Sequence, residues 1–167
     1  MRRTEGIAAC LLGSTVIIGI VVLIWAWPGE FPGCATNAMK NAQKEAVDQL
    51  GDIVKWGLGI SVSVCGLYGS LLLRLRSSPG FTLTGNLFAA AIVVCFAWSA
   101  YFALIWRQLL VEILSQDCIT LIFDPWLKRP FSAFTDFFVA GLALMALMAA
   151  LLMFSPRPPN LGAGGAA

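Results

Sequence analysis

Four long runs of apolar residues, separated by polar segments, organise this chain. They cover residues 7–27, 56–73, 87–106 and 137–154, and none of them contains Asp, Glu, Lys or Arg. Because an α-helix rises 1.5 Å per residue, about 20 apolar residues are enough to cross a hydrocarbon core of ~30 Å. The pattern predicts an all-α integral membrane protein, a single domain over residues 1–167, in which four transmembrane helices form an up-down bundle.

Two of the polar segments also have a helical pattern. Before the second run, apolar residues recur every three or four positions, which is typical of one face of a helix. They are Met39, Ala42, Ala46, Leu50 and Ile53. A similar pattern continues past the third run until Asp124 and Pro125, which we interpret as its end. We therefore expect the second and third helices to extend beyond the membrane, on the side of loops 28–55 and 107–136.

Basic residues are distributed unequally between the two sides of this four-span topology. The N-terminal segment, the connection between the second and third runs and the tail 155–167 together hold five bases and one acid, whereas the loops 28–55 and 107–136 hold six bases and eight acids. Lys and Arg in short segments favour the cytoplasmic side. The sequence therefore predicts that both termini are cytoplasmic and that the two loops lie outside, in a plasma or inner membrane.

The composition agrees with this class and excludes several activities. The chain is 59% hydrophobic and 12% charged, with a mean hydropathy of +0.82, against about 45–50% apolar and about 25% charged residues in soluble domains. It has no histidine, which excludes histidine-ligated haem and most zinc sites. The apolar runs lack the ionisable residue that proton relays and coupled transporters usually need. We expect neither enzymatic activity, a cofactor, a bound metal nor a nucleic-acid partner.

Tryptophans gather at the predicted outer ends of the apolar runs. Indole rings are enriched at membrane–water interfaces, and we interpret four of them as interface anchors: Trp25, Trp27, Trp56 and Trp106. The phenylalanines that precede or open the fourth run are interpreted in the same way. They are Phe131, Phe134, Phe137 and Phe138.

The five cysteines fall into two groups. Cys34 and Cys118 lie one in each outer loop, and the outer side of such a membrane is oxidising, so we predict a disulfide between them. Two free thiols in a reducing compartment are the alternative. The other three, Cys10, Cys65 and Cys95, lie within apolar runs and are interpreted as small packing residues.

Small residues recur at four-residue spacing along the second run. This spacing lets the backbone of a neighbouring helix approach closely. The residues are Gly59, Ser63, Gly66, Gly69 and Ser70, with Cys65 between them. Two interpretations remain open: this face packs inside the four-helix bundle, or it binds another subunit.

These features lead to one main functional hypothesis and two alternatives. The main hypothesis is a non-catalytic membrane subunit with a structural or assembly role, which packs laterally into a larger complex and presents an outer helical cap. One alternative is a homo-oligomeric channel whose pore forms between protomers, and a third possibility is a small carrier or lipid-handling protein. The expected partners are membrane lipid and either other integral membrane subunits or copies of the same chain.

Overall fold

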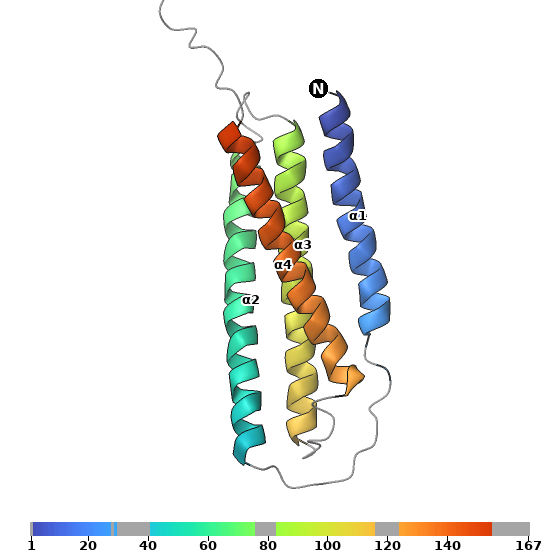
Figure 1. Cartoon of the computed structure of the whole chain (residues 1–167), viewed down its shortest axis with the longest axis vertical. Coiled ribbons are helices and arrows are strands. Elements are labelled where there is room, and N and C mark those ends of the chain that lie inside the picture. The colour runs from blue at the N-terminus through green and yellow to red at the C-terminus, as the bar shows by residue number, and fades with distance from the viewer. Residues whose placement is uncertain (1, 28, 30–40, 76–82, 116–123, 155–167) are drawn as a thin grey trace, which may run out of the picture.

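The computed structural model describes residues 2–27, 29, 41–75, 83–115 and 124–154. These residues form four α-helices and no strand: α1 (Arg2–Ala26), α2 (Asn41–Leu75), α3 (Leu83–Ser115) and α4 (Pro125–Phe154) (Figure 1). Each helix is long and apolar enough to cross a membrane. The prediction of an all-α protein with four potential membrane-spanning helices is therefore confirmed.

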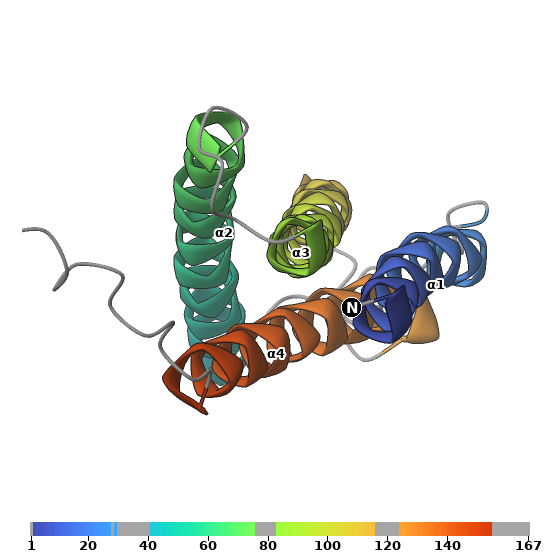
Figure 2. The same ribbon diagram turned by 90° about the horizontal axis from the view of Figure 1, so that it is seen from above.

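Helix α3 lies at the centre of the arrangement. It packs against each of the other three helices, and the view along the bundle shows α1, α2 and α4 around it (Figure 2). Half of the residues in its most apolar stretch are buried, against 11% in α1 and 17% in each of α2 and α4. Since α1, α2 and α4 bury so little of their apolar surface within the chain, most of that surface is available to lipid or to other proteins.

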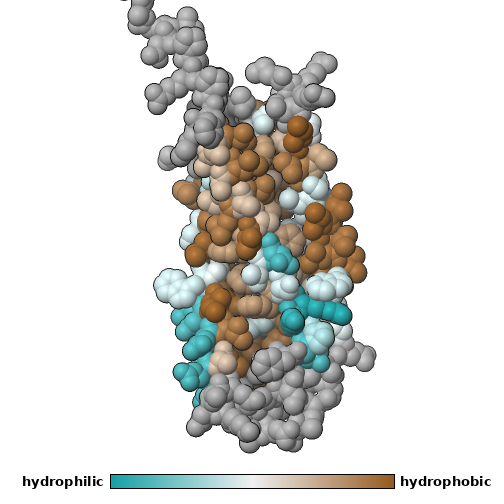
Figure 3. Space-filling view, in the orientation of Figure 1, coloured by the Kyte–Doolittle hydropathy of each residue, from teal (hydrophilic) through white to brown (hydrophobic). Residues whose placement is uncertain are grey.

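The polarity of the molecular surface changes along the length of the bundle. Hydrophobic residues cover the part of the visible face nearer the start of α1, and hydrophilic residues gather toward the opposite end (Figure 3). Exposed aliphatic side chains such as Ile17, Ile24 and Leu67 contribute to the apolar surface. An extended apolar surface of this kind is unfavourable in water and matches a lipid environment.

Helices α2 and α3 are both longer than the apolar runs inside them. Helix α2 runs without interruption from Asn41, through Gly51 and Gly57, to Leu75, and α3 continues past Trp106 to Ser115. The helices that the three-to-four-residue periodicity predicted in the polar segments are therefore present wherever the structure describes the residues of this pattern.

Helix α4 begins earlier than the sequence pattern predicted. The predicted loop 107–136 contains its first turns, because Asp124 starts the helix: Asp124 Oδ1 accepts a hydrogen bond from the Trp126 amide at 2.9 Å, and its carbonyl accepts from the amides of Leu127 and Lys128. Pro125 occupies the first helical position, where a missing N–H costs nothing. The interpretation of Asp124 and Pro125 only as the end of a preceding helix was thus incomplete.

One buried apolar cluster connects all four helices. It joins Ala26 at the end of α1, the first half of α2, the second half of α3 and the first half of α4. From α2 it includes Val47 and Val54, and from α3 and α4 it includes Trp106 and Leu127. Packing therefore brings together the polar ends of α2, α3 and α4, although these ends lie far apart in the sequence.

Candidate functional site: helix contacts and an interhelical groove

Close contacts between the helices are made by glycines that face aromatic rings. On each of α1, α2 and α4, one buried glycine lies under a ring from α3 or α4, where an added Cβ would collide with that ring. A Cβ on Gly141 would lie 2.8 Å from Phe96 Cε2, for example. The three pairs are Gly19 with Trp98, Gly57 with Phe134, and Gly141 with Phe96. Small-residue spacing alone did not identify these glycines, because the partner ring comes from a different helix.

Stacked aromatic rings fill the space between α3 and α4. The ring centroids of Phe102 and Phe137 are 5.8 Å apart with an angle of 10° between the rings, and Trp98 stacks on both at 6.0 and 6.2 Å. Phe134 and Phe137 are buried. The interpretation of these phenylalanines as interface anchors was therefore wrong for Phe134 and Phe137, which are core residues.

Two buried serines connect three helices through hydrogen bonds. Ser61 Oγ of α2 donates to Ser99 Oγ of α3 at 3.5 Å, and Ser99 Oγ donates to the carbonyl of Phe134 on α4 at 3.2 Å. Both serine side chains are fully buried. An unpaired hydroxyl would be costly in this apolar setting, so the network favours one register of the three helices.

None of the residues that the structure describes covers the predicted small-residue face of α2. Gly59, Ser63, Gly66 and Ser70 are exposed, Gly69 is half-buried, and a Cβ on any of the three glycines would meet nothing within 4 Å. Ser63 and Ser70 donate hydrogen bonds to carbonyls of their own helix. Among the described helices this face therefore does not pack inside the bundle, contrary to the first interpretation, and contact with another subunit stays a prediction.

The geometry of α2 explains this exposure. Each residue turns the helix by about 100°, so Ser61 points about 200° away from Gly59. Ser61, Gly57 and Val54 all face the other helices of the chain and are buried. The uncovered small face consequently lies on the opposite side of α2.

Three of the four predicted tryptophan anchors are on the surface. Trp25, Trp27 and Trp56 are 53%, 60% and 75% exposed, and the guanidinium of Arg129 lies 5.3 Å from the ring centroid of Trp25. Trp106 is different, since it is only 3% exposed and packs against Phe131 in the core. Trp106 does lie at the end of an apolar run, but its indole faces the core and not the surface.

The cysteine predictions have separate outcomes. Cys95 is buried in the core, as a packing residue should be, and Cys65 is half-buried with its Sγ 3.6 Å from the carbonyl oxygen of Val93. Cys10 is exposed, so the packing interpretation is wrong for it within this chain. Cys34 and Cys118 lie outside the described residues, and their disulfide remains a prediction.

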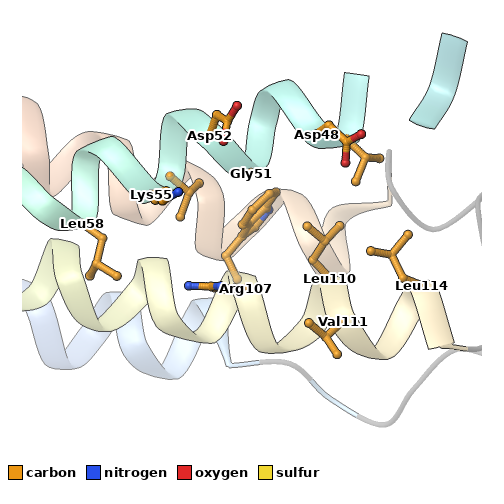
Figure 4. A pocket seen from close by; sticks show the side chains of 12 residues that line it. Asp48, Gly51, Asp52, Lys55, Leu58, Arg107, Leu110, Val111 and Leu114 are labelled. Atoms are coloured by element: carbon orange, nitrogen blue, oxygen red, sulfur yellow. The ribbon is translucent and has the colours of Figure 1, made fainter. Parts of the chain in front are cut away.

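A groove of about 510 Å³ separates α2 and α3 near their polar ends (Figure 4). Its apolar lining includes Val47, Val54, Leu58, Trp106, Leu110 and Leu114. Charged residues line it as well: Asp48, Asp52 and Lys55 from α2, and Arg107 from α3. No sequence motif had indicated this groove, because its two walls lie about 50 residues apart in the chain.

When it is compared with known proteins, the chain matches no protein-family model, no curated protein sequence and no solved structure.

Proposed function

We propose that this protein is a non-catalytic integral membrane subunit with a structural or assembly role in a larger membrane complex. The observation that carries the proposal is the uncovered small-residue face of α2. The chain makes its own close helix contacts at Gly19, Gly57 and Gly141, whereas among the described residues a Cβ on Gly59 or Gly66 would meet nothing within 4 Å. A face of glycines and serines on a membrane helix permits a close approach that lipid chains do not require, so it suits a helix of a partner.

The proposal includes an orientation in the membrane. The four helices form an up-down bundle with both termini in the cytoplasm, and the polar parts of α2 and α3 project as an outer cap. Lys55 and Arg107 support this arrangement, because they are the first charged residues beyond the uncharged stretches of their helices and both line the same groove. The excess of basic residues in the inner segments supports the direction.

The mass of the particle extracted from native membranes in mild detergent tests the proposal. We expect the tagged full-length chain to elute in a complex that contains unlike integral membrane chains, identified by mass spectrometry. A particle built only from copies of this chain would instead favour the homo-oligomeric channel. A monomer after extraction and after cross-linking in intact membranes would overturn both.

A further inference from the structure

The groove between α2 and α3 lies where the uncharged part of each helix ends. Lys55 directly precedes the uncharged stretch of α2, and Arg107 directly follows that of α3. Leu58 and the buried Trp106 line the groove beside these two bases. If the uncharged stretches occupy the hydrocarbon core, the bases lie at the level of the lipid phosphates.

Charges of opposite sign follow one another along the groove. From the apolar end toward the polar end, Figure 4 shows Leu58, then Lys55, then Arg107 with Asp52 at about the same level, and farther on Asp48. On α2, Asp48, Asp52 and Lys55 are separated by four and three residues, which places them on neighbouring turns of the helix. The two bases thus lie closer to the membrane interior than Asp48 does.

This order of charges complements a zwitterionic phospholipid. In phosphatidylethanolamine, acyl chains are followed by a phosphate and then, two carbons farther on, by an ammonium group. We propose that the groove binds one phosphatidylethanolamine molecule, with its phosphate between Lys55 and Arg107 and its ammonium donating a hydrogen bond to the carboxylate of Asp48. The acyl chains would continue along the apolar surface beside Leu58. A volume of about 510 Å³ is within the range of small-molecule sites, about 300–1,000 Å³.

A lipid fits the groove better than a transmembrane helix of a partner. A helix seated here would remove the charges of Lys55 and Arg107 from water and would have to supply an acid opposite them. A phosphate supplies this charge directly and forms charge-assisted hydrogen bonds with both side chains. The two acids then disfavour an anionic lipid such as phosphatidylglycerol, which has no ammonium group.

Lipid titration followed by native mass spectrometry tests the proposal with the delipidated full-length chain. We expect one phosphatidylethanolamine per chain, bound more tightly than phosphatidylglycerol. The double variant Lys55→Gln/Arg107→Gln should weaken binding by at least about tenfold, whereas Lys55→Arg/Arg107→Lys should retain it. The double variant Asp48→Asn/Asp52→Asn should reduce the preference for phosphatidylethanolamine by roughly fivefold or more.

A groove-filling variant separates a binding defect from a folding defect. Gly51 lines the groove, and a Cβ there would meet nothing within 4 Å, so Gly51→Leu adds bulk to the groove and also replaces a poor helix former with a good one. It should abolish binding while the helix content is unchanged. Lys128→Gln and Asp136→Asn, exposed residues of α4 outside the groove, are matched charge controls and should bind normally.

Three results would overturn the proposal. The first is equal binding by the wild type and Lys55→Gln/Arg107→Gln, and the second is a wild-type affinity for phosphatidylglycerol equal to that for phosphatidylethanolamine. The third is a lipid-free dimer that Gly51→Leu converts to a monomer, because the groove would then hold a second copy. These results do not depend on whether the chain also belongs to a larger complex, so this inference and the proposed function can fail separately.

Discussion

Gly141 of α4 lies directly beneath the ring of Phe96 on α3, so close that a Cβ on this glycine would come within 2.8 to 3.0 Å of three ring atoms. Phe96 is fully buried and forms an edge-to-face contact with Phe138, with ring centroids 5.7 Å apart. The ring is therefore confined on more than one side. The approach of α3 and α4 depends on the absence of a side chain at position 141.

We expect Gly141→Val to destabilise the bundle, because a branched side chain would force the Phe96 ring out of its position. Overpacking of this kind costs roughly 1–3 kcal/mol, so the midpoint of thermal unfolding in detergent should fall by several degrees. Gly13→Val is the matched control, since nothing lies within 4 Å of a Cβ at Gly13. Equal midpoints for the two variants would show that the Phe96 ring moves aside freely.

The buried hydrogen bonds of Ser99 predict a coupling between α2 and α3. Ser99→Ala removes the acceptor of Ser61 Oγ and the donor to the Phe134 carbonyl, and membrane hydrogen bonds average about 0.6 kcal/mol. We expect a loss of about 0.5–1.5 kcal/mol and a double-mutant cycle with Ser61→Ala that is clearly non-additive. Ser63→Ala should be neutral, because Ser63 is exposed and bonds only to its own helix. Strict additivity of the Ser61 and Ser99 effects would mean that the two hydroxyls act independently.

The four helices could be predicted from the sequence because each apolar run lies within a single helix and its length is a local property of the sequence. The start of α4 could not, since Lys128, Arg129 and Pro130 interrupt the hydrophobic pattern that marks a span. Pro130 is a helix breaker by rule, yet it lies buried within α4. Tertiary packing therefore overrides the local signal in this segment.

The contacts between helices were less predictable than the helices. The four-residue spacing shows that one face of α2 consists of small residues, but the sequence does not show which helix packs against that face. The ring that covers Gly57 comes from Phe134, 77 positions later in the chain. Likewise, Trp56 begins one apolar run and Trp106 ends another, at the same predicted side of the membrane. The packing of α3 against α2 and α4 buries Trp106 and leaves Trp56 exposed.

The distribution of basic residues predicts the orientation of the chain in the membrane. Because residues 1–6, residues 74–86 and the tail 155–167 together hold five bases against one acid, both termini should be cytoplasmic. In a background in which the native cysteines are replaced, a cysteine introduced at Gln43 should react with a membrane-impermeant reagent added to intact cells. One introduced at Gly164 should react only after permeabilisation. The reverse pattern would invert the topology and would place Lys55 and Arg107 on the cytoplasmic side.

The positions of the five cysteines predict a disulfide between the two loops that we expect on the outer side. Non-reducing peptide mapping should find the Cys34 and Cys118 peptides linked, with Cys10, Cys65 and Cys95 free. In the chain-entropy view, a loop of this length would stabilise the fold by about 4 kcal/mol, but helices inserted in a bilayer are already constrained, so Cys34→Ser should have a much smaller effect. Alkylation of both outer cysteines in native membranes, without prior reduction, would show that they are not paired.

The uncovered face of α2 predicts a variant that assembles poorly but folds well. A Cβ at Gly66 would meet none of the described residues within 4 Å, and leucine is a better helix former than glycine, so Gly66→Leu should keep the thermal midpoint of the isolated protein. In native membranes its bulk would push a partner helix away. The recovery of partner chains should then fall by roughly tenfold, which corresponds to about 1.4 kcal/mol of lost association energy. Gly141→Val, by contrast, should lower the thermal midpoint of the isolated chain.

Gly13→Leu is the matched control for this assembly measurement. It makes the same change at another exposed glycine, on α1, where a Cβ also has open space. We expect it to change neither the midpoint nor the recovery of partners. If Gly66→Leu assembles as well as Gly13→Leu, the small face of α2 contacts lipid. The observation that carries the proposed function would then be lost.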